Sequence, residues 1–145
     1  MLFRSRSPVA EGILRHLSEN RFPDLFIDSA GLIDTHKGEN PDPRSIANAK
    51  RNGVDISLLV SRPLSESDLL NFDSILVMDR KNLDALKKFN NYRNAEHKIL
   101  PAGYFLDSNN PPDIPDPYYG EEKDFQLVFD MLQGVVKAWL EAQCP

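Results

Sequence analysis

The spacing of apolar side chains predicts a helix close to the start of the chain. Ser7 is a good helix cap, and Pro8 suits a first helical position. Apolar residues then recur at intervals of three and four, the period of a helix with one buried face. Those residues are Val9, Ala10, Ile13, Leu14 and Leu17. We therefore expect a helix that begins at Ser7 and Pro8 and carries Glu11 in its first turn.

Three shorter apolar runs predict strands. Residues 26–31 form a short run that ends at a glycine, as a strand leading into a turn does. Residues 72–78 are nearly all apolar towards their end, which is typical of a strand covered on both faces. Residues 98–100 form a further short strand.

The remaining segments read as helices and one irregular loop. Asp42 and Pro43 open a helix that Asn52 and Gly53 close, and helices are also expected over 65–71 and 80–88. Proline, asparagine and aspartate crowd residues 107–119, which predicts an irregular loop. The last helix carries one long apolar stripe, in which the tryptophan is expected to pack in the core. The stripe consists of Phe125, Val128, Phe129, Leu132, Val135, Val136, Trp139 and Leu140.

Strands that alternate with helices predict an α/β fold. We expect one domain over residues 1–145, with a small doubly wound parallel sheet flanked by helices. In such sheets, ligands bind beyond the carboxyl ends of the strands, beside helix N-termini. Three segments are expected there: residues 6–8, 29–31 and 116–119.

Composition narrows the function classes. The net charge is −5, so the chain lacks the excess of basic residues that is usual in nucleic-acid-binding proteins. The single cysteine, Cys144, and three scattered histidines provide neither a disulfide nor a metal-ligand cluster. No apolar run approaches the roughly 20 residues of a membrane span, and the N-terminal run is too short for a signal peptide. We expect a cytoplasmic protein that binds neither nucleic acid nor membranes.

Four sequence segments resemble the low-molecular-weight protein tyrosine phosphatase family, and they follow one another in the same order as in that family. They start at about Arg6 and extend across the whole chain. The first resembles the end of the phosphate loop and its helix, the second and third resemble two strands with their following segments, and the fourth resembles the general-acid loop. The segments are residues 6–12; 28–31 with Gly38 and 41–44; 72–83; and 116–120.

The resemblance implies a fold with four strands and a metal-free, cofactor-free hydrolysis. In this chemistry a cysteine thiolate attacks phosphorus, and backbone N–H groups at a helix start cradle the phosphate oxygens. An arginine grips two oxygens with its planar fork, and an aspartic acid protonates the departing tyrosine oxygen. The implied substrates are phosphotyrosine-containing proteins or small aryl phosphates.

Matching these motifs to the chain assigns seven residues. Arg6 matches the phosphate-gripping arginine, and Asp116 matches the general acid. The other five match phosphate-binding, ring-holding and supporting positions. They are Ser7, next to that arginine; Tyr118 and Tyr119, the aromatic wall; Ser29, which supports the phosphate loop; and Asp79, the acidic residue after the third strand.

The nucleophile departs from the family pattern. It would stand six residues before Arg6, at a position that this chain does not have. Ser5 is too close to Arg6 to replace it, and Cys144 stands at the far end of the chain. The family's first strand, between its second and third strands in the sheet, is also missing, and we expect unpaired edges there. We therefore expect a chain that adopts the family's type of fold but is catalytically inactive.

Several alternatives remain at this stage. The true start could lie upstream of Met1, or the chain could be a non-catalytic relative that binds phosphate or phosphoproteins. A thiol-based arsenate reductase needs relaying cysteines, and a nucleotide-binding protein needs a glycine-rich phosphate loop; neither is present. For single residues, Asp79 could simply cap a helix, and the two tyrosines could pack on the core. Ser29 is expected to have lost its partner.

Overall fold

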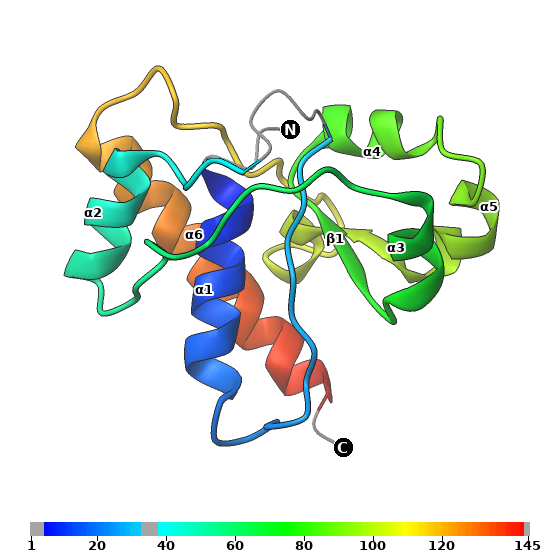
Figure 1. The fold of residues 1–145 in the computed structure, drawn as a ribbon, viewed down its shortest axis with the longest axis horizontal. Coiled ribbons are helices and arrows are strands. Elements are labelled where there is room, and N and C mark those ends of the chain that lie inside the picture. The colour runs from blue at the N-terminus through cyan, green and yellow to red at the C-terminus, as the bar shows by residue number, and fades with distance from the viewer. Residues whose placement is uncertain (1–4, 33–37, 144–145) are drawn as a thin grey trace.

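The computed structural model describes residues 5–32 and 38–143. It has α/β architecture, with helices around a small parallel sheet (Figure 1). The helices are α1 (Arg6–Ser18), α2 (Pro43–Arg51), α3 (Glu66–Asn71), α4 (Arg80–Leu86), α5 (Tyr92–Ala95) and α6 (Glu122–Gln143). The strands are β1 (Ile75–Val77) and β2 (Ile99–Pro101), and the 3₁₀ turns are η1 (Glu96–Lys98) and η2 (Ala102–Phe105).

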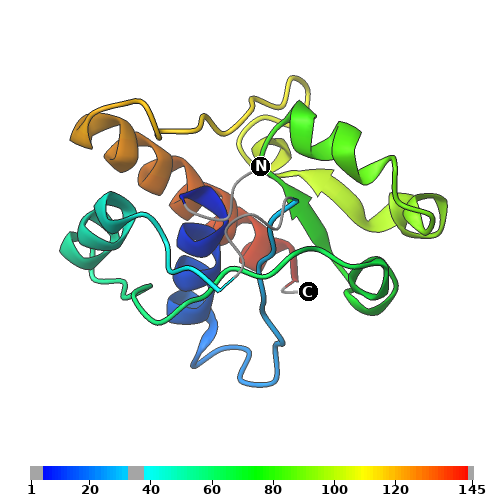
Figure 2. The same ribbon diagram turned by 45° about the horizontal axis from the view of Figure 1, so that its top comes forward.

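The sheet separates two apolar cores. β1 and β2 pair in parallel with Ile75 opposite Ile99, so successive side chains of β1 point to opposite faces. Ile75 and Val77 pack in a core with α3, α4 and α5, whereas Leu76 and Met78 pack in the larger core with α1 and α6. Helices therefore lie on both sides of the sheet, as Figures 1 and 2 show, which agrees with the doubly wound arrangement expected.

Helix α1 begins two residues earlier than the sequence predicts. Ser5, not Ser7, is the N-cap residue, and its side chain makes no capping hydrogen bond. Ser7 lies inside the first turn, and Glu11 lies beyond that turn. The apolar stripe places Val9 and Ile13 in the core against α6.

The caps of the following helices occur at the positions that the sequence predicts. The carboxylate of Asp42 accepts the backbone N–H of Arg44 at 2.8 Å, and Pro43 is the first residue of α2. Gly53 follows the end of α2 with φ of +85°, a left-handed conformation that suits glycine. Ser65 and Asp68 form a capping box at the start of α3.

The later elements are found with small shifts. Helix α4 and the long helix α6 occur where they are expected, and β2 lies one residue later than predicted. The prediction of a strand over 72–78 was too long, because only Ile75–Val77 pair with another strand. Residues 107–119 lack helix and strand, as expected. Helix α5 was not predicted; it is only four residues long.

The predicted strand over 26–31 is wrong. Residues 25–30 have no regular secondary structure, and the segment makes only one isolated parallel bridge, between Gly31 and Pro63. A strand exists through pairing, and within residues 5–32 and 38–143 no neighbouring strand pairs with this apolar run. No helix of the described chain is both long enough and apolar enough to span a membrane.

Candidate active site

Arg6 is a buried cation at the N-terminus of helix α1. Its exposed fraction is 2%, and it is the largest side chain that is almost wholly buried in the described chain. Its Nη1 donates to a carboxylate oxygen of Asp79 at 2.8 Å and also to the backbone carbonyl of Ile114. Its Nε has no hydrogen-bond partner within the described residues. The Nη1 of the guanidinium is thus fixed by two hydrogen bonds, while its Nε remains available to a ligand.

Asp79 has two structural tasks. Its Oδ1 accepts the backbone N–H of Asn82 at 2.9 Å and caps helix α4, which confirms the capping alternative. Its Oδ2 pairs with Arg6. Burial alone would raise the pKa of Asp79, but the hydrogen bonds from Asn82 and Arg6, together with the charge of Arg6, lower it below its ordinary value. Asp79 is therefore ionised at neutral pH.

Ile114 connects Arg6 to the loop that carries Asp116. It is fully buried, and its backbone N–H donates to the carbonyl of Met78 at 2.8 Å, just beyond β1. Asp116 follows two residues later and is exposed. One of its carboxylate oxygens accepts the backbone N–H of Tyr118 at 3.0 Å. Its other oxygen has no partner in the described chain.

Tyr118 and Tyr119 form an exposed aromatic pair rather than packing in the core. Their ring centroids lie 4.8 Å apart at an angle of 86°, and Tyr119 is 97% exposed. Arg44 of α2 holds this segment, because its Nη2 donates to the carbonyl of Tyr118 at 2.9 Å. The guanidinium of Arg44 also lies 4.7 Å from the ring centroid of Phe125 and 5.5 Å from that of Tyr118.

Ser29 has a partner, contrary to the sequence expectation. Its hydroxyl donates to Glu11 at 2.6 Å, and the second oxygen of this carboxylate accepts from Arg15 at 2.8 Å. Glu11 is 6% exposed, so the hydroxyl satisfies a buried charge. Ser7 is half-buried on the first turn of α1, and no hydrogen bond of its hydroxyl is seen within the described chain.

Arg6 and Asp79 are therefore in direct contact, and the Ile114 carbonyl connects Arg6 with the Asp116 loop. Cys144 lies outside the described residues, so nothing places it relative to this site. Within residues 5–32 and 38–143, no cluster of histidine, cysteine and acidic side chains could hold a metal ion.

Sequence reasoning missed three residues of this site. Arg44 was noted only as part of a sequence segment, although its place beside the capping Asp42 could have suggested an anchored arginine. Glu11 was interpreted through the helix dipole, whereas its spacing of four residues from Arg15 indicates an ion pair. Ile114 gave no signal, because it acts through its backbone carbonyl.

Comparison with known proteins identifies the family of the chain. A sequence profile described as low molecular weight phosphotyrosine protein phosphatase matches residues 4–143. The phosphatase of that name from Gallus gallus is 37% identical over 139 residues, which cover 94% of this chain and 87% of the relative.

Solved structures give the same result. A protein tyrosine phosphatase from Entamoeba histolytica, with Hepes in its active site, superposes with a TM-score of 0.86 at 31% identity, covering 95% of this chain and 88% of the other. Vibrio vulnificus Wzb in complex with benzylphosphonate superposes with a TM-score of 0.83 at 28% identity, covering 95% and 90%. The chain belongs to the low molecular weight phosphotyrosine protein phosphatase family, whose members are protein tyrosine phosphatase hydrolases.

Proposed function

We propose that the site at the N-terminus of α1 binds the phosphoryl group of phosphotyrosine proteins or small aryl phosphates. Arg6 is the phosphate ligand, Ser7 lies beside it, and Tyr118 and Tyr119 flank the aromatic ring. Asp116 is the proton donor to the leaving oxygen, while Ser29 and Asp79 are positioning residues, since each acts through a neighbouring group.

One observation carries this proposal: the Nε of the buried Arg6 has no partner in the described chain. A buried donor without a partner costs about 1–3 kcal/mol, and a phosphoryl oxygen would satisfy it. The positive end of the α1 dipole adds to the attraction for an anion. The complex of Wzb with benzylphosphonate, in which a phosphonate group is joined to an aromatic ring through a CH₂ group, supports the same class of ligand.

The contacts of Asp116 support its role as the proposed proton donor. One oxygen of Asp116 is pinned by the Tyr118 N–H, which leaves the other free to carry a proton to a departing phenolate. Arg44 holds the tyrosines from the α2 side, so the aromatic wall and the acid belong to one anchored segment. No metal or cofactor takes part in this proposal.

Binding a phosphate ester needs only the phosphate ligand Arg6, whereas hydrolysis also needs a nucleophile, and an unactivated serine such as Ser5 is a weak one at neutral pH. The non-catalytic binding of phosphate or phosphoproteins is thus the second candidate function. We place this single-domain protein in the cytoplasm, which cell fractionation would test.

Two assays separate these functions. Hydrolysis of an aryl phosphate is measured for this chain and for a version that carries a family-type cysteine loop before residue 1. Turnover in the second alone would assign non-catalytic binding to residues 1–145, and turnover by both that disappears in Arg6→Ala would assign hydrolysis to them.

Binding is measured by NMR titration with phosphate and phenyl phosphate up to about 10 mM, a range that detects even weak sites. Arg6→Met, which keeps a long apolar stem, should abolish binding. Arg51→Met, at an exposed ion pair on α2, is the matched control and should bind normally. If the NMR spectrum of the unmodified chain does not change during the titration, the proposed phosphate site is wrong.

A further inference from the structure

The negative charge of the protein is concentrated in residues 107–124, which we call the acidic segment. This segment carries six carboxylates and one lysine, so its formal charge of −5 equals that of the whole chain, and the remaining residues hold equal numbers of acidic and basic side chains. The carboxylates belong to Asp107, Asp113, Asp116, Glu121, Glu122 and Asp124, and all but the last are on exposed residues. The proposed proton donor and the two tyrosines lie within this segment, so the excess charge surrounds the proposed site.

The acidic segment passes directly beside the proposed phosphate ligand. The carbonyl of Ile114 accepts a hydrogen bond from Arg6, and the carbonyl of Tyr118 accepts one from Arg44 at 2.9 Å. Figure 2 shows the segment running from η2 past the N-terminal end of α1 to the start of α6. A phosphotyrosine held by Arg6 would therefore present its neighbouring residues to the carboxylates of this segment.

Structural tasks account for several of these carboxylates but not for Asp113. Asp107 accepts two backbone N–H groups of its own turn. Asp124 caps the start of α6, where the helix dipole also favours negative charge. Asp113 is exposed, and it makes no hydrogen bond or ion pair within the described residues. Because it adjoins Ile114, a carboxylate without a structural task lies next to the group that anchors the phosphate ligand.

The two arginines that donate to backbone carbonyls of the acidic segment are already paired with carboxylates. Arg6 pairs with Asp79 at 2.8 Å, and Arg44 pairs with Asp42 at 2.8 Å. A phosphotyrosine side chain brings a charge of about −1.5 to −2 at pH 7, whereas the dipole of α1 offers only roughly +0.5. Binding this group would therefore leave uncompensated negative charge beside an acidic segment.

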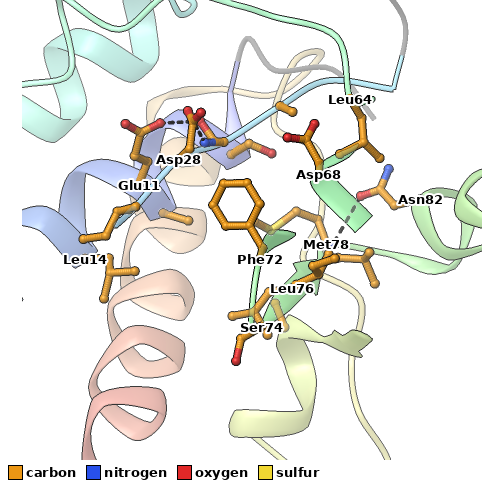
Figure 3. Close-up of a pocket in the computed structure, with 18 of the residues that line it drawn as sticks. Glu11, Leu14, Asp28, Leu64, Asp68, Phe72, Ser74, Leu76, Met78 and Asn82 are labelled. Atoms are coloured by element: carbon orange, nitrogen blue, oxygen red, sulfur yellow. Dashed lines mark hydrogen bonds between the residues drawn. The ribbon is translucent and has the colours of Figure 1, made fainter. Parts of the chain in front are cut away.

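The carboxylates of the pocket between α1 and β1 differ from those of the acidic segment, because each is paired with an arginine. Glu11 accepts from Arg15, and Asp28 and Asp68 both accept from Arg62. Figure 3 shows these three carboxylates along one side of the pocket. A cation brought by a ligand would therefore find its partners in the acidic segment rather than in this pocket.

We propose that the site selects proteins in which lysine or arginine residues flank the phosphotyrosine. This inference rests on the proposed function and names its substrate class. The phosphoryl group binds Arg6, while basic side chains of the substrate lie against the acidic segment near Asp113 and Glu121. The ring of Tyr119, which is 97% exposed, offers these cations a further contact. The substrate thereby supplies the positive charge that the site lacks.

The test compares two capped peptides, in which one phosphotyrosine is flanked on both sides by lysines or by glutamines. Calorimetry measures their binding at ionic strengths of about 10 mM and about 1 M, where the screening length is about 30 Å and about 3 Å. At low salt the lysine peptide should bind at least about fivefold more tightly, and at high salt the difference should fall below about twofold. The lysine peptide without its phosphoryl group should bind at least about tenfold more weakly, because it cannot engage Arg6.

Two double variants locate the charges responsible. Asp113→Asn with Glu121→Gln should lower the preference for the lysine peptide at least about twofold, while phenyl phosphate binding stays unchanged or becomes tighter. Asp73→Asn with Glu96→Gln is the matched control and should keep the full preference. Both control residues are exposed and precede the amino ends of β1 and β2, whereas the proposed site lies beyond the carboxyl end of β1.

The outcomes separate this inference from the function on which it rests. If phenyl phosphate and both peptides fail to bind, the phosphate site and the substrate class are both wrong. If phenyl phosphate binds and the two peptides bind equally well, only the substrate class is wrong. A lysine preference that survives Asp113→Asn with Glu121→Gln, or that falls equally in the control variant, would also overturn the inference.

Discussion

Replacing Asp79 by asparagine removes one charge from the site and little else. Asparagine caps helices as well as aspartate does, so the hydrogen bond from the Asn82 N–H is kept. What is lost is the ionic partner of Arg6, whose guanidinium is 2% exposed. Breaking a buried pair costs about 3–5 kcal/mol, and a hydrogen bond to a charged group contributes about 1.5–3 kcal/mol. Because the Asp79 side chain is 18% exposed, solvent screening reduces this cost. We expect Asp79→Asn to lower the free energy of unfolding by about 2–3 kcal/mol.

Urea unfolding followed through Trp139, the only tryptophan, measures this loss. With a slope of about 2 kcal/mol/M, the midpoint should fall by about 1–1.5 M. Asp79→Ala should lose about 1 kcal/mol more, because the cap disappears as well. Asp84→Asn, at an exposed position of α4, is the control and should stay within about 0.5 kcal/mol of the unmodified chain.

The pH dependence provides a second check. The pKa of Asp79 is lower in the folded than in the unfolded chain, so its ionised form stabilises the fold above the unfolded pKa of about 3.9. That contribution is lost as the pH falls through the folded pKa. The gap between the unmodified chain and Asp79→Asn should therefore be constant above about pH 5 and should shrink below about pH 4. A gap below about 0.5 kcal/mol at pH 7, or one that grows with acid, would refute the reasoning.

Three further substitutions follow from the structure. Ser29→Ala removes a donor from the buried carboxylate of Glu11 and should lower the free energy of unfolding by about 1–3 kcal/mol in urea. Gly103→Ala would place a Cβ 1.8 Å from a backbone carbonyl oxygen of the loop, so a loss of at least about 3 kcal/mol or failure to fold is expected, visible by thermal melting. Arg44→Lys should loosen the Tyr118 segment, with faster amide exchange there and weaker phenyl phosphate binding by NMR.

Each of these has a control that changes the same residue type elsewhere. Ser108→Ala, at an exposed loop position, should leave stability unchanged. Gly134→Ala meets only a flexible leucine methyl group at 3.1 Å and improves helix propensity, so it should be neutral or stabilising. Arg51→Lys changes an exposed ion pair on the same helix and should leave phenyl phosphate binding intact. If a control behaves like its partner variant, the corresponding interpretation is wrong.

The sequence was informative at the caps of α2, which depend on local signals. Helix α2 has Asp42 as its N-cap and Pro43 as its first residue, and Gly53 follows its end, all as predicted. These positions could be predicted because a helix cap depends on residues within one turn of the helix end. The strand over 26–31 could not be judged in this way. Its apolar residues are strand-like, but a strand depends on a neighbour that no local pattern encodes.

The same distinction applies to the site. Arg6, Asp79 and Asp116 could be named from motifs, whereas the contacts that Arg6 makes with Asp79 and with the loop before Asp116 depend on long-range folding. The carbonyl of Ile114 is 108 residues from Arg6 along the chain, and Arg44 reaches Tyr118 across 74 residues. Backbone acceptors carry no residue type, so sequence inspection cannot single them out.

The position of Arg6 gives the physical reason for the proposed anion site. A cation at the positive end of a helix dipole is unfavourable by about 0.3–1 kcal/mol, and burial raises that cost. The first turn of α1 contains no acidic residue, so compensation comes from Asp79 and the Ile114 carbonyl, and both act on the single nitrogen Nη1. Nε remains without a partner in the described chain. A bound phosphoryl group would correct both deficits at once, because it supplies negative charge to the dipole and an acceptor to Nε. The arrangement that is unfavourable in the empty protein would therefore be the source of the proposed affinity for a phosphate ester.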